Sequence, residues 1–267
     1  MATKPDIANP EMEFDVRDLD LNDGETVLIW PDASGKGNDA IRAGTTTPNF
    51  VRNGWSDGID AIRLQDQNQN FQERFIFSGE PEFLNTEATF FIVFEATDLT
   101  DGVALLGSNF GTSPPPRLHS ISVDIDGTIF YNKEFNPRLI NSAPGVIEQG
   151  GRYIVTGRMS FVTGMILRVN GVEVGALNNA DARNGTDSWP GASIGQTRNI
   201  VNPGGEYGID KLIVWLSGYS FAASDAEILA MESFLGGIFF IAAPTDWLPC
   251  VPDPATVWLD CIPIVLP

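Results

Sequence analysis

The chain has few of the residues on which catalytic and metal sites most often depend. It contains one histidine and two cysteines among 267 residues, and Cys250 and Cys261 both lie near the C-terminus. This scarcity argues against a disulfide framework and against a zinc site built from clustered cysteines and histidines. The single histidine, His119, comes with no Gly-x-Ser-x-Gly sequence, so a nucleophilic triad is not indicated.

Basic residues and long apolar runs are also scarce. The chain has 16 Lys and Arg against 35 Asp and Glu, a net charge of −19. Nucleic acids and anionic membranes attract basic surfaces, so we expect neither as a partner. The longest fully apolar run, Ile238 to Pro244, is too short to span a bilayer, and the residues after Met1 lack the apolar core of a signal peptide. We therefore expect synthesis in the cytoplasm without export and no membrane insertion.

What the sequence does contain is a series of short apolar runs separated by turn residues, with 27 glycines and 18 prolines. The runs 89–94, 120–125 and 152–156 have the length and composition of strands. Asn170-Gly171 and Asp126-Gly127 each separate two such runs, which is a strong signal for a hairpin. Frequent strands without intervening helices predict an all-β sandwich or barrel.

One short helix is expected late in the chain. Ser224 and Glu227 have the spacing of a capping box, in which each side chain bonds the backbone of the other residue. The apolar residues that follow at helical spacing are Ile228, Met231 and Leu235. Gly236-Gly237 is expected to end the helix, which would pack against an edge of the sandwich.

The two ends of the chain differ from its middle. We divide it into an N-terminal arm (1–12), a sandwich (13–240) and an extended docking tail (241–267). The tail contains a repeat, Thr245 to Pro252 and Thr256 to Pro263, whose prolines exclude a helix. Its predicted docking residues are Trp247, Leu248, Trp258, Leu259 and Ile262.

An exposed apolar tail is an association liability, so we expect it to dock. Its Trp residues would be anchors on a symmetry mate or on another protein of the assembly, and docking on the chain's own sandwich is the alternative. Cys250 and Cys261 could pair across the tail, although reduced thiols are the default for a chain made in the cytoplasm.

Val27 to Ala40 contains the pattern Trp-x-Asp-x-Ser-Gly-x-Gly-Asn-x-Ala. It resembles the signature of laminin G-like, concanavalin A-like domains, which occur in bacterial surface proteins and bacteriophage appendages. Weaker matches, such as the Leu167 to Gly171 hairpin and the Gly208 to Trp215 strand, follow in family order, so the resemblance covers roughly residues 13–240. It implies a concanavalin A-like jelly-roll sandwich, a fold that hosts lectins, glycosidases and scaffolds alike.

Two kinds of ligand site are candidates. Asp32, Asn38 and Asp39 share a Gly-rich turn and could supply oxygen ligands to Ca²⁺, with Asp98 and Asp101 as a weaker second set. The alternative is that these side chains cap their own turns. For sugars, the candidates are Trp189, Trp55 and the nearby Asp187, with Tyr131 and Tyr219 also placed in or near loops. Trp30 and Trp215 lie within apolar runs and are predicted to belong to the core.

The leading hypothesis from the sequence is a non-enzymatic structural component of a bacteriophage virion, a capsid decoration or tail appendage. It would be made in the host cytoplasm and attached through its terminal segments to other virion proteins or symmetry mates. The alternative is a carbohydrate-binding module for host cell-surface glycans. A remote alternative is a glycosidase using Glu13 and Asp15, which nearly match an alternating carboxylate strand but lie on the opening strand.

Overall fold

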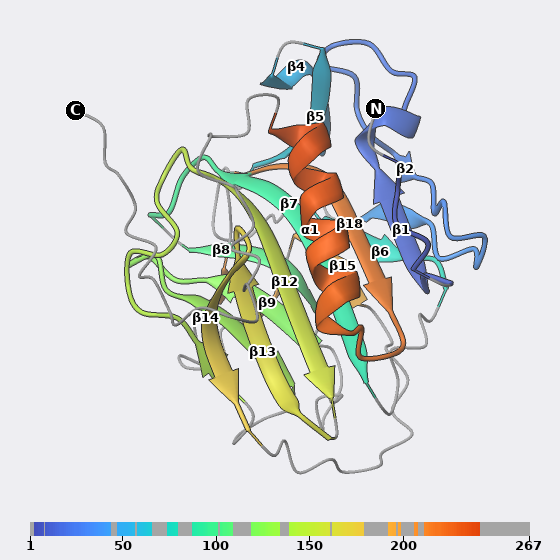
Figure 1. Cartoon of the computed structure of the whole chain (residues 1–267). Helices are drawn as coiled ribbons and strands as arrows, with labels where there is room; N and C mark the ends of the chain where they lie inside the picture. Colours follow the sequence, from blue (N-terminus) through green and yellow to red (C-terminus); the bar gives the residue numbers. More distant parts are fainter. Residues whose placement is uncertain are drawn as a thin grey trace, which may run out of the picture.

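Two antiparallel sheets form the body of the protein and confirm the predicted β-sandwich (Figure 1). The computed structural model describes residues 3–7, 9–43, 47–56, 58–65, 74–79, 87–100, 102–108, 119–133, 139–160, 162–178, 192–195, 197–198, 206–207 and 211–240. Sheet A has the strand order β14-β13-β12-β7-β18-β5-β4, and β1 also pairs with β18. Sheet B has the order β11-β10-β9-β8-β15-β6-β3-β2.

The strands of sheet A are β1 (Met12–Asp15), β4 (Asn49–Ser56), β5 (Ile59–Leu64), β7 (Ala88–Ala96), β12 (Arg152–Ser160), β13 (Gly164–Val169), β14 (Val172–Leu177) and β18 (Lys211–Tyr219). Those of sheet B are β2 (Ile29–Trp30), β3 (Ala40–Ala43), β6 (Arg74–Phe77), β8 (Val103–Ser108), β9 (His119–Val123), β10 (Ile129–Lys133), β11 (Leu139–Asn141) and β15 (Ala192–Ile194). A small third pair is formed by β16 (Thr197–Arg198) and β17 (Glu206–Tyr207), and the helices are η1 (Val16–Asp18) and α1 (Asp225–Phe239).

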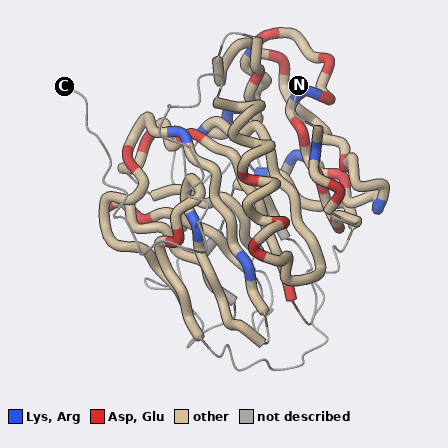
Figure 2. The backbone as a smooth tube through the Cα atoms, in the orientation of Figure 1, with Lys and Arg blue, Asp and Glu red and all other residues tan. Residues whose placement is uncertain are grey.

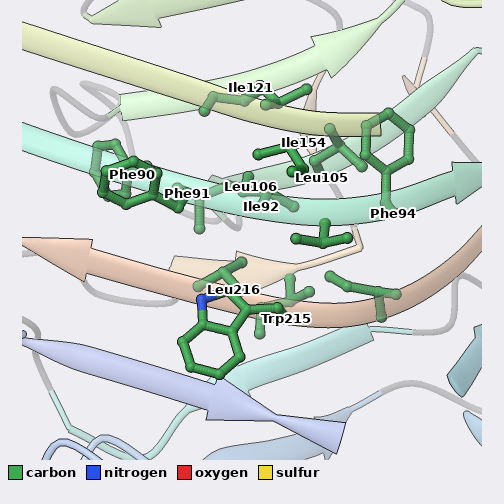
Figure 3. Close-up of a cluster of buried hydrophobic side chains, with 14 of the residues drawn as sticks. Phe90, Phe91, Ile92, Phe94, Leu105, Leu106, Ile121, Ile154, Trp215 and Leu216 are labelled. Atoms are coloured by element: carbon green, nitrogen blue, oxygen red, sulfur yellow. The ribbon is translucent and has the colours of Figure 1, made fainter. Parts of the chain in front are cut away.

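The core has two layers, one on each side of sheet A. β7 and β18 are buried along almost their whole length, which is typical of strands covered on both faces (Figure 3). Phe90 points between the sheets, with its ring centroid 6.4 Å from that of Tyr131, whereas Phe91 points to the other side and lies 6.0 Å from Tyr219. The near-continuous apolar sequence of β7 is therefore explained by its place in the middle of the molecule.

Local turn chemistry is confirmed at the predicted hairpin between β13 and β14. Asn170 and Gly171 have φ angles of 49° and 80°, as a two-residue turn with left-handed backbone requires. The Asn170 side chain also accepts a hydrogen bond from the Ile154 backbone N–H at 2.7 Å, which ties the turn to β12.

Helix α1 covers the outward face of sheet A rather than an edge of the sandwich. Its capping box at Ser224 and Glu227 is present as predicted. The helix continues past Gly236 and Gly237, where the sequence suggested its end, to Phe239. Phe239 is 1% exposed, and its burial outweighs the roughly 1 kcal/mol that each helical glycine costs relative to alanine. No helix in the described ranges is long and apolar enough to cross a membrane.

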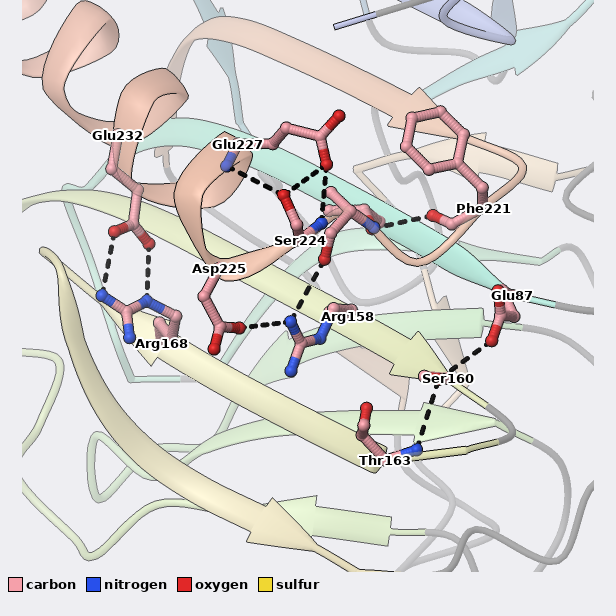
Figure 4. A network of polar contacts seen from close by, with 12 residues as sticks. Glu87, Arg158, Ser160, Thr163, Arg168, Phe221, Ser224, Asp225, Glu227 and Glu232 are labelled. Atoms are coloured by element: carbon pink, nitrogen blue, oxygen red, sulfur yellow. Dashed lines mark hydrogen bonds and ion pairs between the residues drawn. The ribbon is translucent and has the colours of Figure 1, made fainter.

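A polar network connects α1 to the strands below it (Figure 4). Glu232, 2% exposed, accepts hydrogen bonds from Thr156 Oγ1 at 2.8 Å and from Nε and Nη2 of Arg168 at 3.0 and 3.1 Å. Arg158 bonds the carbonyl of Ala223 at 3.1 Å and pairs with the exposed Asp225. Because Glu232 has three donors, the helix is fixed to β12 and β13 by a satisfied buried charge.

Part of the predicted N-terminal arm belongs to the sandwich. Met12 begins β1 and is fully buried, and Ile7 is only 5% exposed. The Glu11 backbone N–H bonds the Gly218 carbonyl at 2.8 Å, which continues the pairing of β1 with β18. Burial of these two apolar side chains is the physical reason that the segment lies on sheet A.

Candidate functional site

The turn that carries the recognised signature acts as a structural connection between the sheets. Trp30 is fully buried and its indole N–H donates to the Asp15 carbonyl at 3.1 Å. Both oxygens of Asp32 are engaged: Oδ1 accepts from the backbone N–H of Glu13 and of Ser34, each at 2.9 Å. Its Oδ2 accepts from Ser34 Oγ at 2.6 Å and from the Asn38 backbone at 3.0 Å.

The two other predicted calcium ligands serve the same turn. Asn38 Nδ2 donates to the Glu11 carbonyl at 2.7 Å, and Asp39 Oδ1 accepts from the Asp32 backbone at 2.9 Å. In the second candidate set, Asp98 accepts from the Thr100 backbone, whereas Asp101 lies outside the described residues. Across the described ranges, no three His, Cys, Asp or Glu side chains group so that they could hold a metal ion. These oxygens therefore cap backbone groups, which is the alternative that the sequence left open.

The aromatic candidates for sugar stacking need correction at Trp55. This residue lies in β4 and is fully buried, with its indole N–H donating to the Phe239 carbonyl at 2.6 Å. The guanidinium of Arg152 lies 4.8 Å from the ring centroid, so the ring has no face left for a sugar. Tyr131 and Tyr219, predicted near loops, are also fully buried, in β10 and β18. Burial is also the first cause that raises the pKa of both phenols, with the charge of Glu13 as a second cause at Tyr219.

Other predicted site residues lie outside the described part of the chain. They are Asp187 and Trp189, together with the docking-tail residues Trp247, Leu248, Cys250, Trp258, Leu259, Cys261 and Ile262. The core assignments of Trp30 and Trp215 are confirmed, since Trp30 is 0% and Trp215 1% exposed.

The two carboxylates of the glycosidase alternative are paired with cations. Glu13 and Asp15 are each 7% exposed and point to the outward face of sheet A. Glu13 contacts Lys4, and Asp15 accepts from Arg17 Nε at 2.9 Å and Nη2 at 2.5 Å. The hydrogen bond that Arg17 donates to Asp15 is the main cause that raises the pKa of Arg17. Figure 2 shows acidic and basic positions close together in this N-terminal part of the chain.

The outward face of sheet B carries a group of small and polar side chains. Ile121 and Tyr131 point into the core, where their atoms lie 3.3 Å from the position that a Cβ on Gly157 would take. Because side chains alternate along a strand, Ser120 and Ser122 of β9 point outward. The strand pairings place residues of β10, β8 and β15 on the same face as these two serines. We call it the polar face, and its residues, all of them buried, are Ala104, Gly107, Ser120, Ser122, Asn132 and Ser193.

Asn132 is the most informative member of the polar face. It lies opposite Ser120 and is 4% exposed, and its Oδ1 is buried without a hydrogen-bond partner. A buried acceptor without a donor costs about 1–3 kcal/mol, so a native structure seldom keeps one without a reason. Phe130, half-buried, lies on the same face opposite Ser122. An unsatisfied amide oxygen, neighbouring hydroxyls and an aromatic ring are groups that bind a polyhydroxylated ligand.

The predicted sugar-binding residues Asp187 and Trp189 precede β15 in the sequence and lie outside the described residues. The run 120–125, with its alternating Ser120 and Ser122, was predicted as a strand without a function. The alternation was visible; which of its two faces points outward was not.

Comparison with known proteins identifies the fold. No known protein family and no curated protein matches the chain. Among solved structures, it is similar to a Trypanosoma rangeli sialidase in complex with sialic acid, with a TM-score of 0.54 and 17% identity over 85% of this chain and 33% of that one. It is also similar to botulinum neurotoxin type C, whose cell entry depends on two ganglioside molecules, with a TM-score of 0.59 and 11% identity over 85% of this chain and 51% of that one.

A third similar structure is the binding domain of botulinum neurotoxin DC in complex with SialylT, with a TM-score of 0.56 and 10% identity over 85% of this chain and 52% of that one. The chain thus spans about a third of the sialidase and about half of each toxin chain. At these identities the likeness shows the fold alone, a lectin-like β-sandwich.

Proposed function

We propose that the chain is a non-enzymatic glycan-binding sandwich, in which the polar face of sheet B hydrogen-bonds sugar hydroxyls. The observation that carries the proposal is the unpartnered Oδ1 of Asn132, which lies with Ser120 (7% exposed) and Ser122 (8% exposed) on the side of sheet B away from the core. A sugar hydroxyl would satisfy this acceptor, and Phe130 offers an apolar surface for a sugar ring. The sialic acid complex of one structural neighbour, and the dependence of another's cell entry on two ganglioside molecules, support a sugar as the ligand.

A glycan array, probed with the full chain in the presence of millimolar Ca²⁺ and again with chelator, tests the proposal. We expect hits that weaken roughly tenfold in Asn132→Ala, the loss of about one hydrogen bond. Asn178→Ala removes an exposed asparagine after the end of β14 and is the matched control. An empty array, or hits that Asn132→Ala leaves unchanged, would contradict the proposal.

The absence of catalysis is part of the same proposal. Glu13 and Asp15 are paired with Lys4 and Arg17 on the outward face of sheet A, whereas the polar face belongs to sheet B. Incubation of each bound glycan with the protein should therefore release no product. Hydrolysis that disappears in Glu13→Gln would overturn this part of the proposal and leave glycan binding in place.

We further propose an assembly role for the segment 241–267, in a virion or another multi-subunit particle. The supporting observation is its repeated Trp-Leu-x-Cys-aliphatic-Pro unit, with only three charged residues from Gly236 onward. Light scattering of the full chain beside a chain that ends at Phe240, which preserves the buried Phe239, tests it. We expect a larger solution mass for the full chain, and equal monomeric masses would contradict the role.

A further inference from the structure

Lys4 is held on sheet A by one carboxylate and one aromatic ring. Its ammonium group pairs with the Glu13 carboxylate and lies over the Trp215 ring, 5.8 Å from the ring centroid. Glu13 lies opposite Ser217 on β18, two positions after Trp215, so all three side chains point to the outward face of sheet A. A carboxylate beside the face of an indole ring attracts a cation through both its charge and the ring quadrupole.

The place that the ammonium occupies is buried and keeps a polar group that Lys4 does not use. Glu13 is 7% and Trp215 1% exposed. Tyr219, two positions after Ser217 on the same face, is fully buried, and its Oη has no hydrogen-bond partner. Burial, and then the charge of Glu13, raise the pKa of Tyr219, so the phenol lies near this carboxylate. An ammonium group has three donors, and a phenol oxygen beside Glu13 is a second acceptor for them.

The segment that carries Lys4 has few attachments to the sandwich. We call residues 3–7 the strap. Its one backbone hydrogen bond within the described residues is internal, from the Ile7 N–H to the Pro5 carbonyl at 2.9 Å, and the first backbone bond to sheet A is made by Glu11. The strap is therefore held by the ammonium of Lys4 and by the burial of Ile7, which is 5% exposed. A segment with so few backbone hydrogen bonds opens at a low cost in free energy.

The site is accessible from solvent through the place of Lys4 itself. The Lys4 side chain is 35% exposed, whereas that of Glu13 is 10% exposed. The lysine stem thus leads from solvent to a buried carboxylate and ring, and departure of this side chain opens the same path to another ammonium group.

We propose that Glu13, Trp215 and Tyr219 form a binding site for a primary ammonium group, which Lys4 occupies as a ligand tethered to the chain. The ligand class is an unbranched alkylammonium, the chemistry of a lysine side chain. The strap is then a built-in competitor, and an external ligand binds by displacing Lys4. This inference is independent of the proposed glycan binding, which belongs to sheet B.

Chemical rescue of the full chain tests the inference. Lys4→Ala removes three methylenes and the ammonium, which n-propylammonium supplies as a free molecule. We expect Lys4→Ala to have a lower Tm than the wild type, and n-propylammonium chloride at about 100 mM to restore most of the loss relative to the same concentration of sodium chloride. Ligand-observed NMR should also show n-propylammonium binding to Lys4→Ala roughly tenfold or more tightly than to the wild type, in which the tethered Lys4 competes.

Lys36→Ala is the matched control. Lys36 lies 3.4 Å from the buried carboxylate of Glu11, but among the described residues it lies over no aromatic ring. Propan-1-ol, which has the same alkyl chain without the charge, is the second control, and neither should reproduce the effect. Equal rescue of both lysine variants, or rescue by propan-1-ol, would show a general charge or solvent effect and overturn the inference. Where Lys4→Ala melts like the wild type, the NMR titration decides, and binding no tighter than to the wild type overturns it.

Discussion

The outward faces of the two sheets are built in different ways. On sheet A, large aromatic and charged side chains are covered by α1: Trp215 packs on Phe234 and Phe239, and Glu232 has three hydrogen-bond donors. On sheet B, no helix within the described ranges covers the polar face, and the Oδ1 of Asn132 has no donor. Each face nevertheless has buried polar atoms without a partner: Tyr219 Oη and Arg158 Nε on sheet A, and Asn132 Oδ1 on sheet B. The cover of α1 is therefore the difference between the two faces: it stabilises the outward face of sheet A, and the recognition role that we propose belongs to sheet B.

The largest expected effect is on sheet A, at Trp215. Trp215→Ala should lower the free energy of unfolding by about 3–5 kcal/mol, because it leaves a cavity between β18 and α1. Urea denaturation followed by circular dichroism measures it. A loss below about 1 kcal/mol would mean that α1 does not contribute to the core, and the contrast between the faces would fail.

The next effect is at the buried charge beneath the helix. Glu232→Ala leaves Arg168, whose side chain is 16% exposed, without its carboxylate partner, and should cost about 3 kcal/mol. Asp225→Ala is the matched control. Because the Asp225 side chain is 83% exposed, its pairing with Arg158 should contribute less than about 1 kcal/mol. Similar losses in the two variants would show that burial does not determine how much each ion pair contributes to the free energy of unfolding.

The capping box should make a smaller, pH-dependent contribution to the free energy of unfolding. Ser224→Ala should cost about 1 kcal/mol at neutral pH. Hydrogen bonds from Ser224 lower the pKa of Glu227 below its ordinary value of 4.5, so the stability from this bond is present above that value. It is lost as the pH falls through the lowered pKa of the folded state. Thermal melts of both proteins between pH 7 and pH 2 should therefore show a difference that shrinks in acid, and a constant difference would contradict this account.

The smallest effect on stability is expected on the polar face. Asn132→Ala removes a buried acceptor that has no partner, so its free energy of unfolding should change by less than about 1 kcal/mol while glycan binding falls. Denaturation and titration of the same sample measure both. A large loss of stability without a loss of binding would show that Asn132 stabilises the fold and does not bind the ligand. The proposed difference in role between the two faces would then be wrong.

Several features of the fold could be predicted because their causes are local. The turn at Asn170-Gly171 depends on two residues that tolerate positive φ, and the start of α1 depends on Ser224 and Glu227, three positions apart. The end of α1 was predicted too early because its cause is not local. Phe239 keeps the helix going through packing on Trp55 and Trp215, residues distant in sequence.

The candidate site was less predictable, for the same reason. Trp55 was expected to stack on sugars, but the carbonyl of Phe239, 184 positions later, binds its indole and the helix end buries it. The polar face was missed because Ser120, Asn132 and Ser193 come from three strands with no common motif. Alternation along each strand shows that one face is polar, but it cannot say which strands lie side by side.

The sequence by itself determined the β-sandwich, its tight hairpins and the single late helix, because apolar spacing and turn residues act over a few positions. Its composition also determined the low content of residues for metal or triad chemistry. Only the tertiary structure decided that α1 covers sheet A, that the Asp32 turn connects the sheets, and that Asn132 lies in register with Ser120 on an outward face. Strand order and register depend on contacts between distant residues, and these contacts determine which side chains lie together on one face of a sheet.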